Sequence, residues 1–543
     1  MFVEPVFGKK FFGREDVLAT LKKRVTALKG GYRQNLALAG PMLAGKSSIL
    51  RHFLKNIDDP EVIPLYIEMT GEDFAAFSER FMGSLLFHYL RASGIKPEGE
   101  LKELKKVCRS MIPETVTCMD GVSKAIKEKK NNVAYETLLG MTSVFKTETG
   151  KSCLVILDEF HNLADFNLKK PFQTFGKFIM VQKNTMYIVS SSQKTLLKEI
   201  LSKKLSLLFG NFEILDVDGF DNQTSRTFVS EKMPDVDYGN DIVGYIVQVS
   251  QGSPFYLEVL SGRFNELFRS REGGDAGECL LEAFASLLYS PEGILNQYFS
   301  NNINFFLEKR SRKSFIPILV SLACGNSTIK ALQNDMGRVD RDLSRKLQKL
   351  QEMDLVFKSG VFYKITDKLF EYWLKYVYSL KSRSMVDDLD IKYLEFKKLL
   401  ADDLRSYGEF ASKDVVERIC DLFRSFRNEK VRIRMNERKL PAFDSVSCEG
   451  ISPHLSRLTC VIGDKEWICH VVRNDMAAEA DISGLIEDSP RDGARKAVRR
   501  VIIPLKGVEQ NAFLLAKDRN IWVWDLRLLN GIFRLYKNHE LVL

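Results

Sequence analysis

One short segment limits the folds open to this chain more than any other. Residues 40–47 read Gly-Pro-Met-Leu-Ala-Gly-Lys-Ser. The apolar residues 36–40 predict a short buried strand before this segment, and the apolar positions in 48–57 predict a helix after it. A glycine-rich turn between a strand and a helix points several backbone N–H groups and the helix N-terminus at one place, which favours a phosphate group. We therefore expect an α/β fold with a parallel sheet and a phosphate-binding loop at its edge.

The loop has the spacing of a nucleoside triphosphate site, and its residues receive roles accordingly. Lys46 is expected to place its ammonium on the β- and γ-phosphates of ATP, and the Ser47 hydroxyl is expected to ligate Mg²⁺. The other residues expected to contact the nucleotide here are Gly40, Pro41, Ala44, Gly45 and Ser48.

A second motif follows about 110 residues later. Cys153 to Leu157 form an apolar run that predicts a central parallel strand buried on both faces, and Asp158 and Glu159 stand at its end. Ligands of open α/β sheets bind at the carboxyl ends of the strands. We expect Asp158 to hold Mg²⁺ and Glu159 to orient or deprotonate the attacking water. The alternative is an acidic pair that caps a surface loop.

A third apolar strand, at 186–192, ends in hydroxyl side chains. Ser191 or Ser192 is expected to sense the γ-phosphate from a strand next to the acidic one. The alternative is that these serines serve only the following turn.

Three further segments carry a resemblance to a known family. They are FFGRE at 11–15, QGSPFYLEVL at 251–260 and FYKITDKLFEYWLKYV at 362–377. In this order, with the phosphate-binding loop and the acidic strand, they resemble the archaeal-type P-loop ATPases, which are related to AAA+ and STAND proteins and similar to origin-recognition-type ATPases. The resemblance covers roughly residues 8–380.

The resemblance implies further contacts with the nucleotide. Phe12, Gly13, Arg14 and Glu15 would lie near the adenine, and Pro254, with Gly252, would reach the nucleotide from a helical lid. Family members often carry an arginine where this chain has Asn211. A cation there could act on a neighbour's γ-phosphate, so its absence favours a slow switch over fast, oligomer-driven hydrolysis. Arg14 or Arg263 could substitute.

The domain order expected from these observations is a P-loop ATPase core at 1–217, a helical lid at 218–300, a winged helix at 301–382 and a nuclease-like α/β domain at 383–543. Within the core, residues 70–150 predict amphipathic helices inserted between the phosphate-binding loop and the acidic strand. Their lysines are expected to form a solvated face or, alternatively, a partner surface.

Residues 314–365 predict three helices and a β-wing, the elements of a winged helix. In the third helix Leu343, Leu347 and Leu350 share one face and are expected in the core. Between 309 and 349 there are ten Lys or Arg and three Asp, a local net charge of +7. Double-stranded DNA is therefore a predicted partner, and a winged helix that binds protein is the alternative. The residues expected to contact DNA are Arg338, Arg341 and Arg345.

The last 150 residues or so mix helices with strands expected at 458–464, 465–472 and 520–526. In the resembled family this position often holds a domain similar to restriction-type nucleases, which use carboxylates and a lysine around Mg²⁺. Glu417 and Asp444 match two of the carboxylates. The strand that should carry Glu-x-Lys has Cys469, His470 and Val471, with only Arg473 as a nearby cation. We expect a degenerate nuclease-like fold used for binding, and a packed histidine rather than a metal ligand at His470.

Composition agrees with a cytoplasmic protein that has an anionic partner. The net charge is +9 over 543 residues, and no apolar stretch or leader suggests a membrane or export. The nine cysteines contain no Cys-x-x-Cys pair, and those in apolar runs, such as Cys153 and Cys324, are expected to be buried thiols. An oligomer is possible.

The sequence therefore predicts an ATPase that binds ATP and Mg²⁺, hydrolyses ATP slowly, and acts as a nucleotide-dependent switch on DNA or a partner through its winged helix. Two alternatives stay open. One is an ATP-gated metal-dependent nuclease. The other is an interaction protein for which ATP is only a structural ligand.

Overall fold

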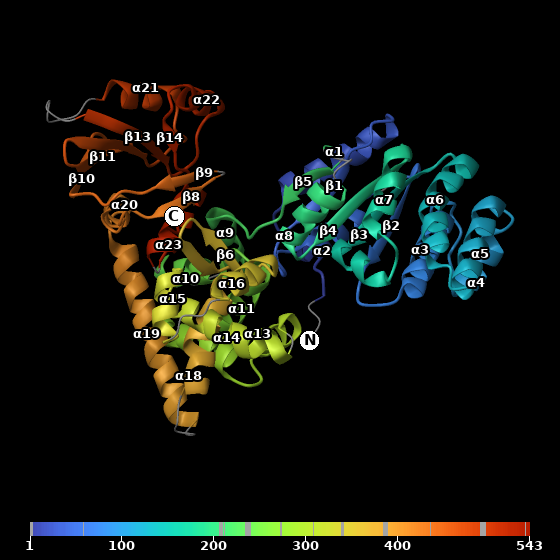
Figure 1. The fold of residues 1–543 in the computed structure, drawn as a ribbon, viewed down its shortest axis with the longest axis horizontal. Helices are drawn as coiled ribbons and strands as arrows, with labels where there is room; N and C mark the ends of the chain where they lie inside the picture. The colour runs from blue at the N-terminus through green and yellow to red at the C-terminus, as the bar shows by residue number, and fades with distance from the viewer. Residues whose placement is uncertain are drawn as a thin grey trace. The chain divides into compact units, whose positions relative to one another are not determined.

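Apolar runs and amphipathic helices alternate in the first 220 residues, and they fold into one unit around a parallel sheet (Figure 1). The chain up to Phe220 belongs to this first unit, with Ser253–Phe255 and Glu352–Asp354; the second unit contains Asp221–Gly252, Tyr256–Gln351 and Leu355–Leu543. The computed structural model describes residues 4–57, 59–205, 210, 212–233, 240–271, 274–307, 309–337, 342–383, 389–434, 436–488, 496–537 and 539–543.

The sheet of the first unit has five strands, and every neighbouring pair is parallel. Its order is β2-β3-β4-β1-β5. The strands are β1 (Asn35–Ala39), β2 (Val62–Glu68), β3 (Ser152–Asp158), β4 (Thr185–Ser191) and β5 (Phe212–Asp216). All residues of β1, β3 and β4 are buried, as expected for central parallel strands covered on both faces. The predicted α/β fold with a parallel sheet is confirmed.

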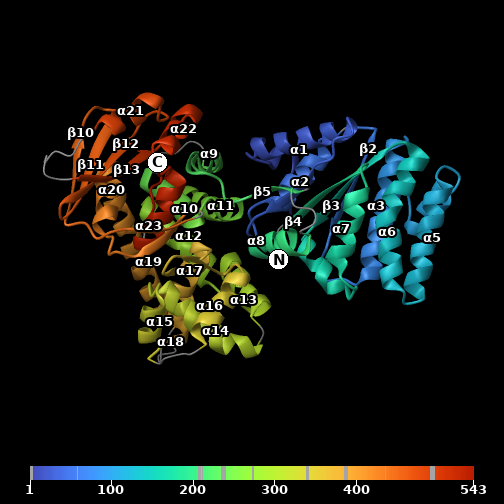
Figure 2. The same cartoon turned by 45° about the horizontal axis from the view of Figure 1, so that its top comes forward.

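Helices cover both faces of this sheet (Figure 2). On β3, Leu154 and Ile156 face the side of α1 and α2, whereas Cys153 and Val155 face the other side, because successive strand residues point to opposite faces. The helices are α1 (Glu15–Lys29), α2 (Lys46–Lys55), α3 (Phe74–Ala92), α4 (Leu101–Cys108), α5 (Pro113–Lys127), α6 (Asn131–Thr149), α7 (Pro171–Val181) and α8 (Lys194–Glu199), with short helical turns at Gly8–Lys10, Phe160–Phe166 and Ile200–Lys204.

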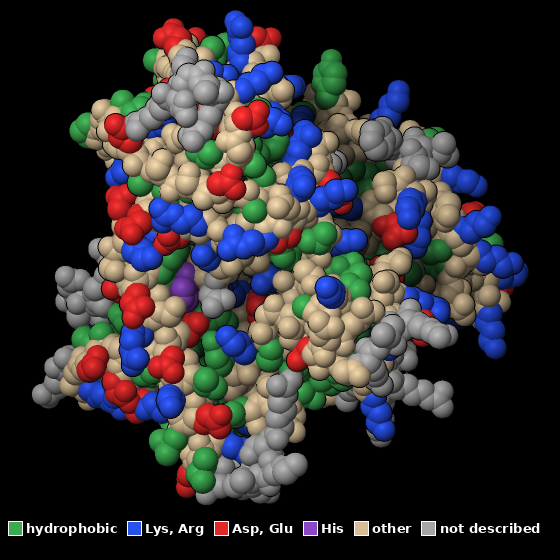
Figure 3. Space-filling model, turned by 60° about the vertical axis from the view of Figure 1, so that its left-hand side comes forward, with side chains coloured by type: hydrophobic (Ala, Val, Ile, Leu, Met, Phe, Trp, Pro, Cys, Tyr) green, Lys and Arg blue, Asp and Glu red, His purple; other side chains and the backbone are tan. Residues whose placement is uncertain are grey.

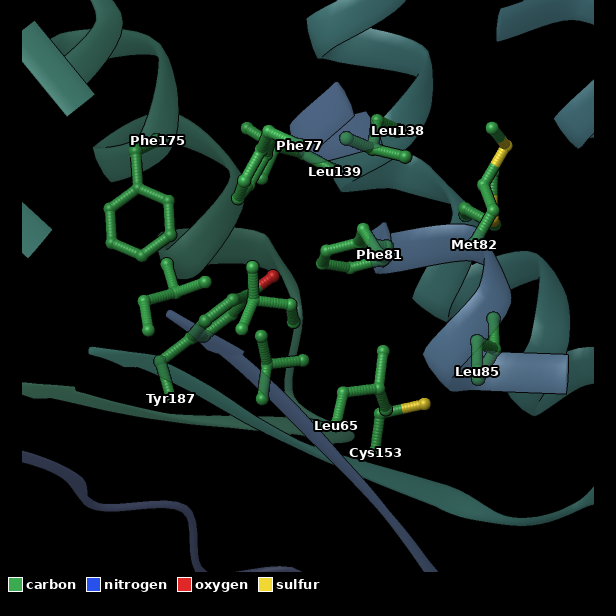
Figure 4. Close-up of a cluster of buried hydrophobic side chains, with 14 of the residues drawn as sticks. Leu65, Phe77, Phe81, Met82, Leu85, Leu138, Leu139, Cys153, Phe175 and Tyr187 are labelled. Carbon is green, nitrogen blue, oxygen red and sulfur yellow. The ribbon is translucent and has the colours of Figure 1, made fainter. Parts of the chain in front are cut away.

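The predicted inserted helices are α3 to α6, and they extend the core away from the sheet. Figure 4 shows Leu65, Cys153 and Tyr187 of the sheet facing Phe81 of α3 and Leu139 of α6, all buried. The insertion is thus built onto the same hydrophobic core as the sheet. That core holds the edge strand β2 in place, and side chains of β2 reach the site described below.

The second unit begins with helices, as predicted for 218–290. They are α9 (Asn222–Lys232), α10 (Asn240–Ser250), α11 (Pro254–Ser270), α12 (Ala276–Phe284) and α13 (Ile294–Phe306), with a π-helical turn at Ala285–Tyr289. Asp221 caps α9 by accepting a hydrogen bond from Thr224 N at 2.8 Å.

Three helices and a two-stranded antiparallel hairpin follow, which are the elements predicted for this region. They are α14 (Lys309–Ala323), α15 (Ile329–Asp335), α16 (Leu343–Glu352), β6 (Val356–Ser359) and β7 (Phe362–Ile365). The three leucines of α16 are buried, as predicted: Leu343, Leu347 and Leu350. We call the β6–β7 hairpin the wing. After it come α17 (Lys368–Trp373), a π-helical turn at Leu374–Tyr378 and α18 (Ser379–Arg383).

The long helix α19 (Leu389–Ser412) is tied to the helices before it by one carboxylate. Asp403 of α19 accepts hydrogen bonds from Tyr245 of α10 at 2.8 Å, from Tyr372 of α17 and from Tyr376 at 3.4 Å. Three buried tyrosines donate to one half-buried acid, so α10, α17 and α19 are held in one arrangement.

The chain ends in a mixed sheet in the order β10-β11-β12-β13-β14. The first two pairings are antiparallel and the last two are parallel. The strands are β10 (Ser445–Gly450), β11 (Leu455–Ile462), β12 (Lys465–Val472), β13 (Lys496–Pro504) and β14 (Trp522–Val523). The helices around it are α20 (Val415–Arg424), α21 (Glu479–Glu487), α22 (Gln510–Asp518) and α23 (Leu526–Tyr536), and a separate hairpin pairs β8 (Lys430–Ile433) with β9 (Asn436–Lys439).

The two cysteines that were predicted to be buried meet different outcomes. Cys153 is buried as predicted, but Cys324 is exposed, because it follows the last residue of α14 and the chain turns away at Gly325. In the part of the chain that the structure describes, no helix combines the length and the apolar character needed to cross a membrane.

The buried His539 makes the stability of the second unit sensitive to acid. Its ring lies 3.1 Å from both Gln248 Nε2 and Ser406 Oγ, and burial, opposed by the carboxylate of Asp403, lowers its pKa from 6.5 to about 4. The unfolded chain therefore binds more protons than the folded chain between these two pKa values, so stability is complete above pH 6.5 and falls as the pH drops toward 4.

We expect His539→Gln, which keeps a hydrogen-bonding side chain, to flatten this dependence by up to about 1.4 kcal/mol per pH unit. Urea unfolding of the wild type and of the variant at several pH values in this window measures it. Identical slopes for the two proteins would contradict the assignment.

Candidate nucleotide site

The phosphate-binding loop between β1 and α2 needs glycine at two positions. A Cβ on Gly40 would stand 2.0 Å from the carbonyl oxygen of Val217, so no larger residue fits beside the chain that follows β5. Gly45 has a φ of 91° at the start of α2, where a side chain would be strained. The loop is thus held tightly against the sheet, and its N–H groups converge at the N-terminus of α2.

Lys46 is buried, and its ammonium is held by the loop itself. Its Nζ donates to the carbonyl oxygens of Gly40 and Pro41, each at 2.9 Å. Burial lowers the pKa of Lys46, while the charges of Glu159 and Asp158 oppose that effect. The side chain is therefore folded back over its own loop, at the place where a phosphate would offer it a stronger, charged acceptor.

Asp158, at the end of β3, collects three hydroxyl groups. Its carboxylate accepts hydrogen bonds from Ser47 Oγ at 2.6 Å, from the Tyr66 hydroxyl at 2.6 Å and from Ser190 Oγ. Burial, followed by the negative charge of Asp158, raises the pKa of Tyr66, so this hydroxyl remains protonated and donates. The structure thus brings together the two predicted magnesium ligands, Ser47 and Asp158.

This arrangement fits Mg²⁺. The ion takes one or two oxygen ligands from the protein and completes its shell with phosphate oxygens and water. Ser47 and Asp158 supply two such oxygens next to the phosphate-binding loop. The hydrogen bond between them shows that these two oxygens lie close together.

Glu159 follows in a left-handed backbone conformation, with a φ of 54°. Its Oε2 accepts hydrogen bonds from the backbone N–H and the hydroxyl of Ser192, at 2.8 and 2.9 Å. Its other oxygen, Oε1, makes no hydrogen bond within the described ranges. One oxygen is therefore fixed and the other is open to a water molecule, which suits the role predicted for Glu159.

His161 connects Glu159 to the strand next to it. Its Nδ1 lies 2.9 Å from Ser191 Oγ and 3.3 Å from Glu159 Oε2, and its Nε2 lies 3.1 Å from Gln193 Nε2. Burial lowers the pKa of His161, with Glu159 opposing, which favours a neutral ring at neutral pH.

The three consecutive serines at the end of β4 thus contact three different residues of the acidic strand and its loop. Ser190 donates to Asp158, Ser191 pairs with His161, and Ser192 binds Glu159. The sequence pointed to Ser191 and Ser192 as phosphate sensors. Ser191 is fully buried and its hydroxyl is engaged by His161, whereas Ser192 binds Glu159.

Sequence reasoning missed four residues of this site: Tyr66, Ser190, His161 and Gln193. Only His161, within Asp-Glu-Phe-His, carried a signal, since histidine is uncommon in this chain and stands two residues after Glu159. Tyr66 lies on a different strand, and nothing in the spacing of Val62–Glu68 relates it to Asp158.

The Phe-Gly-Arg-Glu segment packs behind the loop. Arg14, in a left-handed conformation before α1, donates to the carbonyl oxygens of Ala44 at 3.0 Å and Asp218 at 2.6 Å, and its guanidinium lies 4.6 Å from the centre of the Phe220 ring. The Phe12 ring meets Phe220 edge-on at 5.8 Å. Arg14 therefore stabilises the phosphate-binding loop of its own chain.

The remaining predicted contacts are distributed as follows. Pro254 Cγ would lie 3.9 Å from a Cβ on Gly45, next to the loop, and Ser48 accepts a hydrogen bond from Val6 N. Arg263 is engaged by Ser286 and Glu266. Asn211 lies outside the described residues.

On the predicted DNA-binding helix, Arg345 is exposed on the face of α16 opposite the buried leucines. Arg338 and Arg341 lie outside the described residues. Lys349 is also exposed on α16, so this helix presents two cations to solvent.

The predicted nuclease residues do not meet. Asp444 accepts a hydrogen bond from Gly463 N at 2.7 Å, beyond one end of β11, whereas Arg473 donates to Asp414 and Ser456 at the other end. The eight residues of β11 separate them by about 25 Å. Glu417 stands exposed in the first turn of α20, one turn after Asp414.

His470 is packed, as expected. It is buried with Nε2 at 2.9 Å from Asp488, which also pairs with Arg457 at 2.7 Å. Within the described ranges, no three acidic, histidine or cysteine side chains gather in a way that could hold a metal ion.

Comparison with known proteins supports the assignment of the first unit. Residues 11–260 match the model of a family described as an ATPase domain predominantly from Archaea. This segment is an archaeal-type ATPase domain. The match includes the phosphate-binding loop, the acidic strand, the serines of β4 and Pro254. No curated protein matches the chain.

Solved structures to which this chain is similar include a Walker-type ATPase and two Orc proteins. A Walker-type ATPase of Pyrococcus abyssi is 20% identical, with a TM-score of 0.44 over 68% of this chain and 97% of its own. The Orc2 protein of Aeropyrum pernix, solved with ADPNP and ADP, is 10% identical, with a TM-score of 0.41 over 74% and 98%. The Orc1 protein of the same organism, solved with DNA, is 14% identical, with a TM-score of 0.35 over 67% and 92%.

Nucleotide affinity is expected to depend on Lys46, whose Nζ lies on the phosphate-binding loop. We expect Lys46→Ala to weaken ATP binding by about 10- to 150-fold, which corresponds to the loss of one hydrogen bond to a charged partner. Calorimetric titration with ATP and Mg²⁺ measures it. Lys22→Ala, which removes an exposed lysine from α1, is the matched control and should bind like the wild type. Equal affinities for the two variants would exclude this site.

Proposed function

We propose that this chain binds ATP with Mg²⁺, hydrolyses it slowly, and uses the nucleotide state to control its binding to double-stranded DNA. The observation that carries the ATPase part is the convergence of Lys46, Ser47, Asp158 and Glu159 at the carboxyl ends of β1 and β3. The match of residues 11–260 to an ATPase domain family supports it.

Each of these residues has a task in the proposed reaction. Lys46 exchanges its two carbonyl acceptors for the β- and γ-phosphate oxygens. Ser47 and Asp158 would hold Mg²⁺, and the bound ion would supply neutralisation of the charge on the phosphates. Glu159 Oε1 orients a water and takes its proton as the water oxygen bonds to the γ-phosphorus and the bond to the bridging oxygen breaks. ADP and phosphate leave.

We propose slow turnover because the described residues supply no unengaged arginine to this site. Arg14 is committed to two carbonyl oxygens and to the Phe220 ring, and Arg263 to Ser286 and Glu266. A positive side chain acting on the γ-phosphate accelerates such reactions by several orders of magnitude, so its absence favours a long-lived ATP state. A long-lived ATP state is typical of a nucleotide-dependent switch.

The DNA part of the proposal is supported by α16. A helix with three buried leucines on one face and Arg345 and Lys349 exposed on the other, preceded by two helices and followed by a wing, is the arrangement with which winged helices enter a groove. The chain's net charge of +9 agrees with an anionic partner.

Replacing Glu159 tests whether the site hydrolyses ATP. We expect Glu159→Gln to lower the hydrolysis rate by about 100- to 10,000-fold, the usual contribution of a general base, with ATP affinity changed by a few-fold at most. Phosphate release and calorimetry measure the two quantities. Glu79→Gln, an exposed acid on α3, is the control. A wild type without turnover would leave ATP as a structural ligand only.

The DNA part is tested by salt dependence. We expect Arg345→Gln combined with Lys349→Gln to reduce the slope of log affinity against log salt by about 2 for duplex DNA, since each lost phosphate contact removes about 0.9. Fluorescence anisotropy with a labelled duplex, with and without ATP, measures it. An unchanged slope in both nucleotide states would place DNA binding elsewhere or exclude it.

A further inference from the structure

The hairpin β8–β9, which was not predicted from the sequence, carries five Lys or Arg and one Glu in ten residues, 430–439. It is docked on the wing. Val361 N donates to the carbonyl oxygen of Lys430 at 3.0 Å, and Arg432 N donates to Ser359 Oγ at 3.0 Å. A Cβ on Gly360 would collide with the Lys430 carbonyl at 1.8 Å, so the contact is close. The hairpin is therefore a fixed extension of the wing.

Cations of this hairpin stand opposite one another. Lys430 pairs across the two strands with Lys439, and both are exposed. Like charges directly opposite in a β-ladder are unfavourable. Neither lysine has an acidic side chain within ion-pair distance in the described ranges. Arg434, by contrast, is paired with Asp525 at 3.6 Å.

Two further arginines share one aromatic ring. The guanidinium of Arg499, on β13, lies 4.3 Å from the centre of the Trp522 ring, and that of Arg438, on β9, lies 5.6 Å from it. Burial, and after it the charge of Arg438, lowers the pKa of Arg499. The ring holds both cations in place, and among the described side chains neither has an acidic partner.

The same end of the mixed sheet adds a third pair. Lys465 and Lys496, the first residues of β12 and β13, are neighbours in register, both are exposed, and Arg499 lies further along β13. We call Lys430, Lys439, Arg438, Arg499, Lys465 and Lys496 the hairpin surface, which extends over both faces of the hairpin because Arg438 and Lys439 are successive residues of β9 and point to opposite faces. Figure 3 shows one face of the molecule, on which Lys and Arg side chains lie among Asp and Glu side chains.

An aromatic ring and two strand pairings hold these like charges close together, so they repel one another. A ligand with several negative charges at regular spacing would lower this repulsion. Guanidinium groups bind phosphate through two parallel hydrogen bonds. The two strands present no exposed apolar side chain in their described part, so a surface that inserts into a membrane is not favoured. The Trp522 ring is occupied by the two guanidinium groups, which favours contact with phosphates over stacking with bases.

We propose that the hairpin surface binds the phosphodiester backbone of a nucleic acid, separately from the contacts of α16. It would grip backbone without reading sequence, because its groups are cations on long side chains. This inference goes beyond the proposed function: it does not require Arg345 or ATP.

The test uses the full-length protein and three sets of substitutions. The first is Lys430→Gln, Lys439→Gln and Lys496→Gln, three exposed lysines that have no acidic partner among the described side chains. The second is Arg438→Gln with Arg499→Gln. The matched control is Lys398→Gln, Arg405→Gln and Lys506→Gln, which removes three exposed cations elsewhere in the second unit, Lys506 standing beyond the opposite end of β13. Circular dichroism and the urea midpoint establish that each variant is folded.

Binding is measured by anisotropy with a duplex of about 30 base pairs and with the matching single strand, between about 50 and 200 mM salt. We expect the first set to weaken duplex binding by about 10-fold or more and to lower the salt slope by 2 to 3, at about 0.9 per contact, with the control unchanged. The second set should act in the same direction. A larger loss with the single strand than with the duplex would identify single-stranded nucleic acid as the source of the backbone.

Failure of this inference is distinguishable from failure of the proposed function. If both hairpin sets bind like the control while Arg345→Gln with Lys349→Gln loses the salt slope, the hairpin surface is not a nucleic-acid site and the winged helix is. If the hairpin sets lose binding and the α16 variant does not, the hairpin surface stands and the role of α16 falls.

Discussion

The short contact between Ser47 and Asp158 depends on the whole parallel sheet. One residue begins the helix after β1 and the other ends β3, and β4 lies between these two strands. They meet because all five strands run the same way and therefore end at the same edge, where the connecting loops converge. A single antiparallel strand in this set would carry one of the two groups to the opposite edge. The candidate site follows from strand direction before any side chain is considered.

The same edge explains the distribution of tasks among neighbouring strands. β3 delivers Asp158, with Glu159 just after it, β2 reaches in with Tyr66, and β4 supplies three hydroxyls in a row. Asp158 is buried and accepts hydrogen bonds from three hydroxyls, so its negative charge is tolerated there. His161 joins the second of these groups to β4 and makes Glu159 and Ser191 parts of one hydrogen-bonded set. Replacing one residue of this set is therefore expected to alter the hydrogen bonds of the others.

How much of the candidate site could be predicted from the sequence depends on whether a residue's hydrogen-bond partners are close to it in the chain. The phosphate-binding loop and the Asp158–Glu159 strand were predicted because each is a continuous segment with its own pattern. Tyr66 and Ser190 were missed because they acquire their role only through strand order, which no local spacing encodes. The hairpin β8–β9 did carry a signal, the alternation of Val431 and Ile433 with cations, which the number of charges obscured.

The last residues of the chain pack onto some of the first helices of the second unit. Asn222 of α9 donates to the carbonyl oxygen of Leu541, 319 residues later, and His539 pairs with Gln248 of α10. During synthesis at about 5 to 20 residues per second, α9 and α10 leave the ribosome roughly 15 to 60 seconds before these partners exist. The ATPase domain can close its sheet during that interval, whereas the helices after it wait with apolar surface uncovered. The order of translation thus completes the parallel sheet of the first unit before the helices of the second unit have their C-terminal partners.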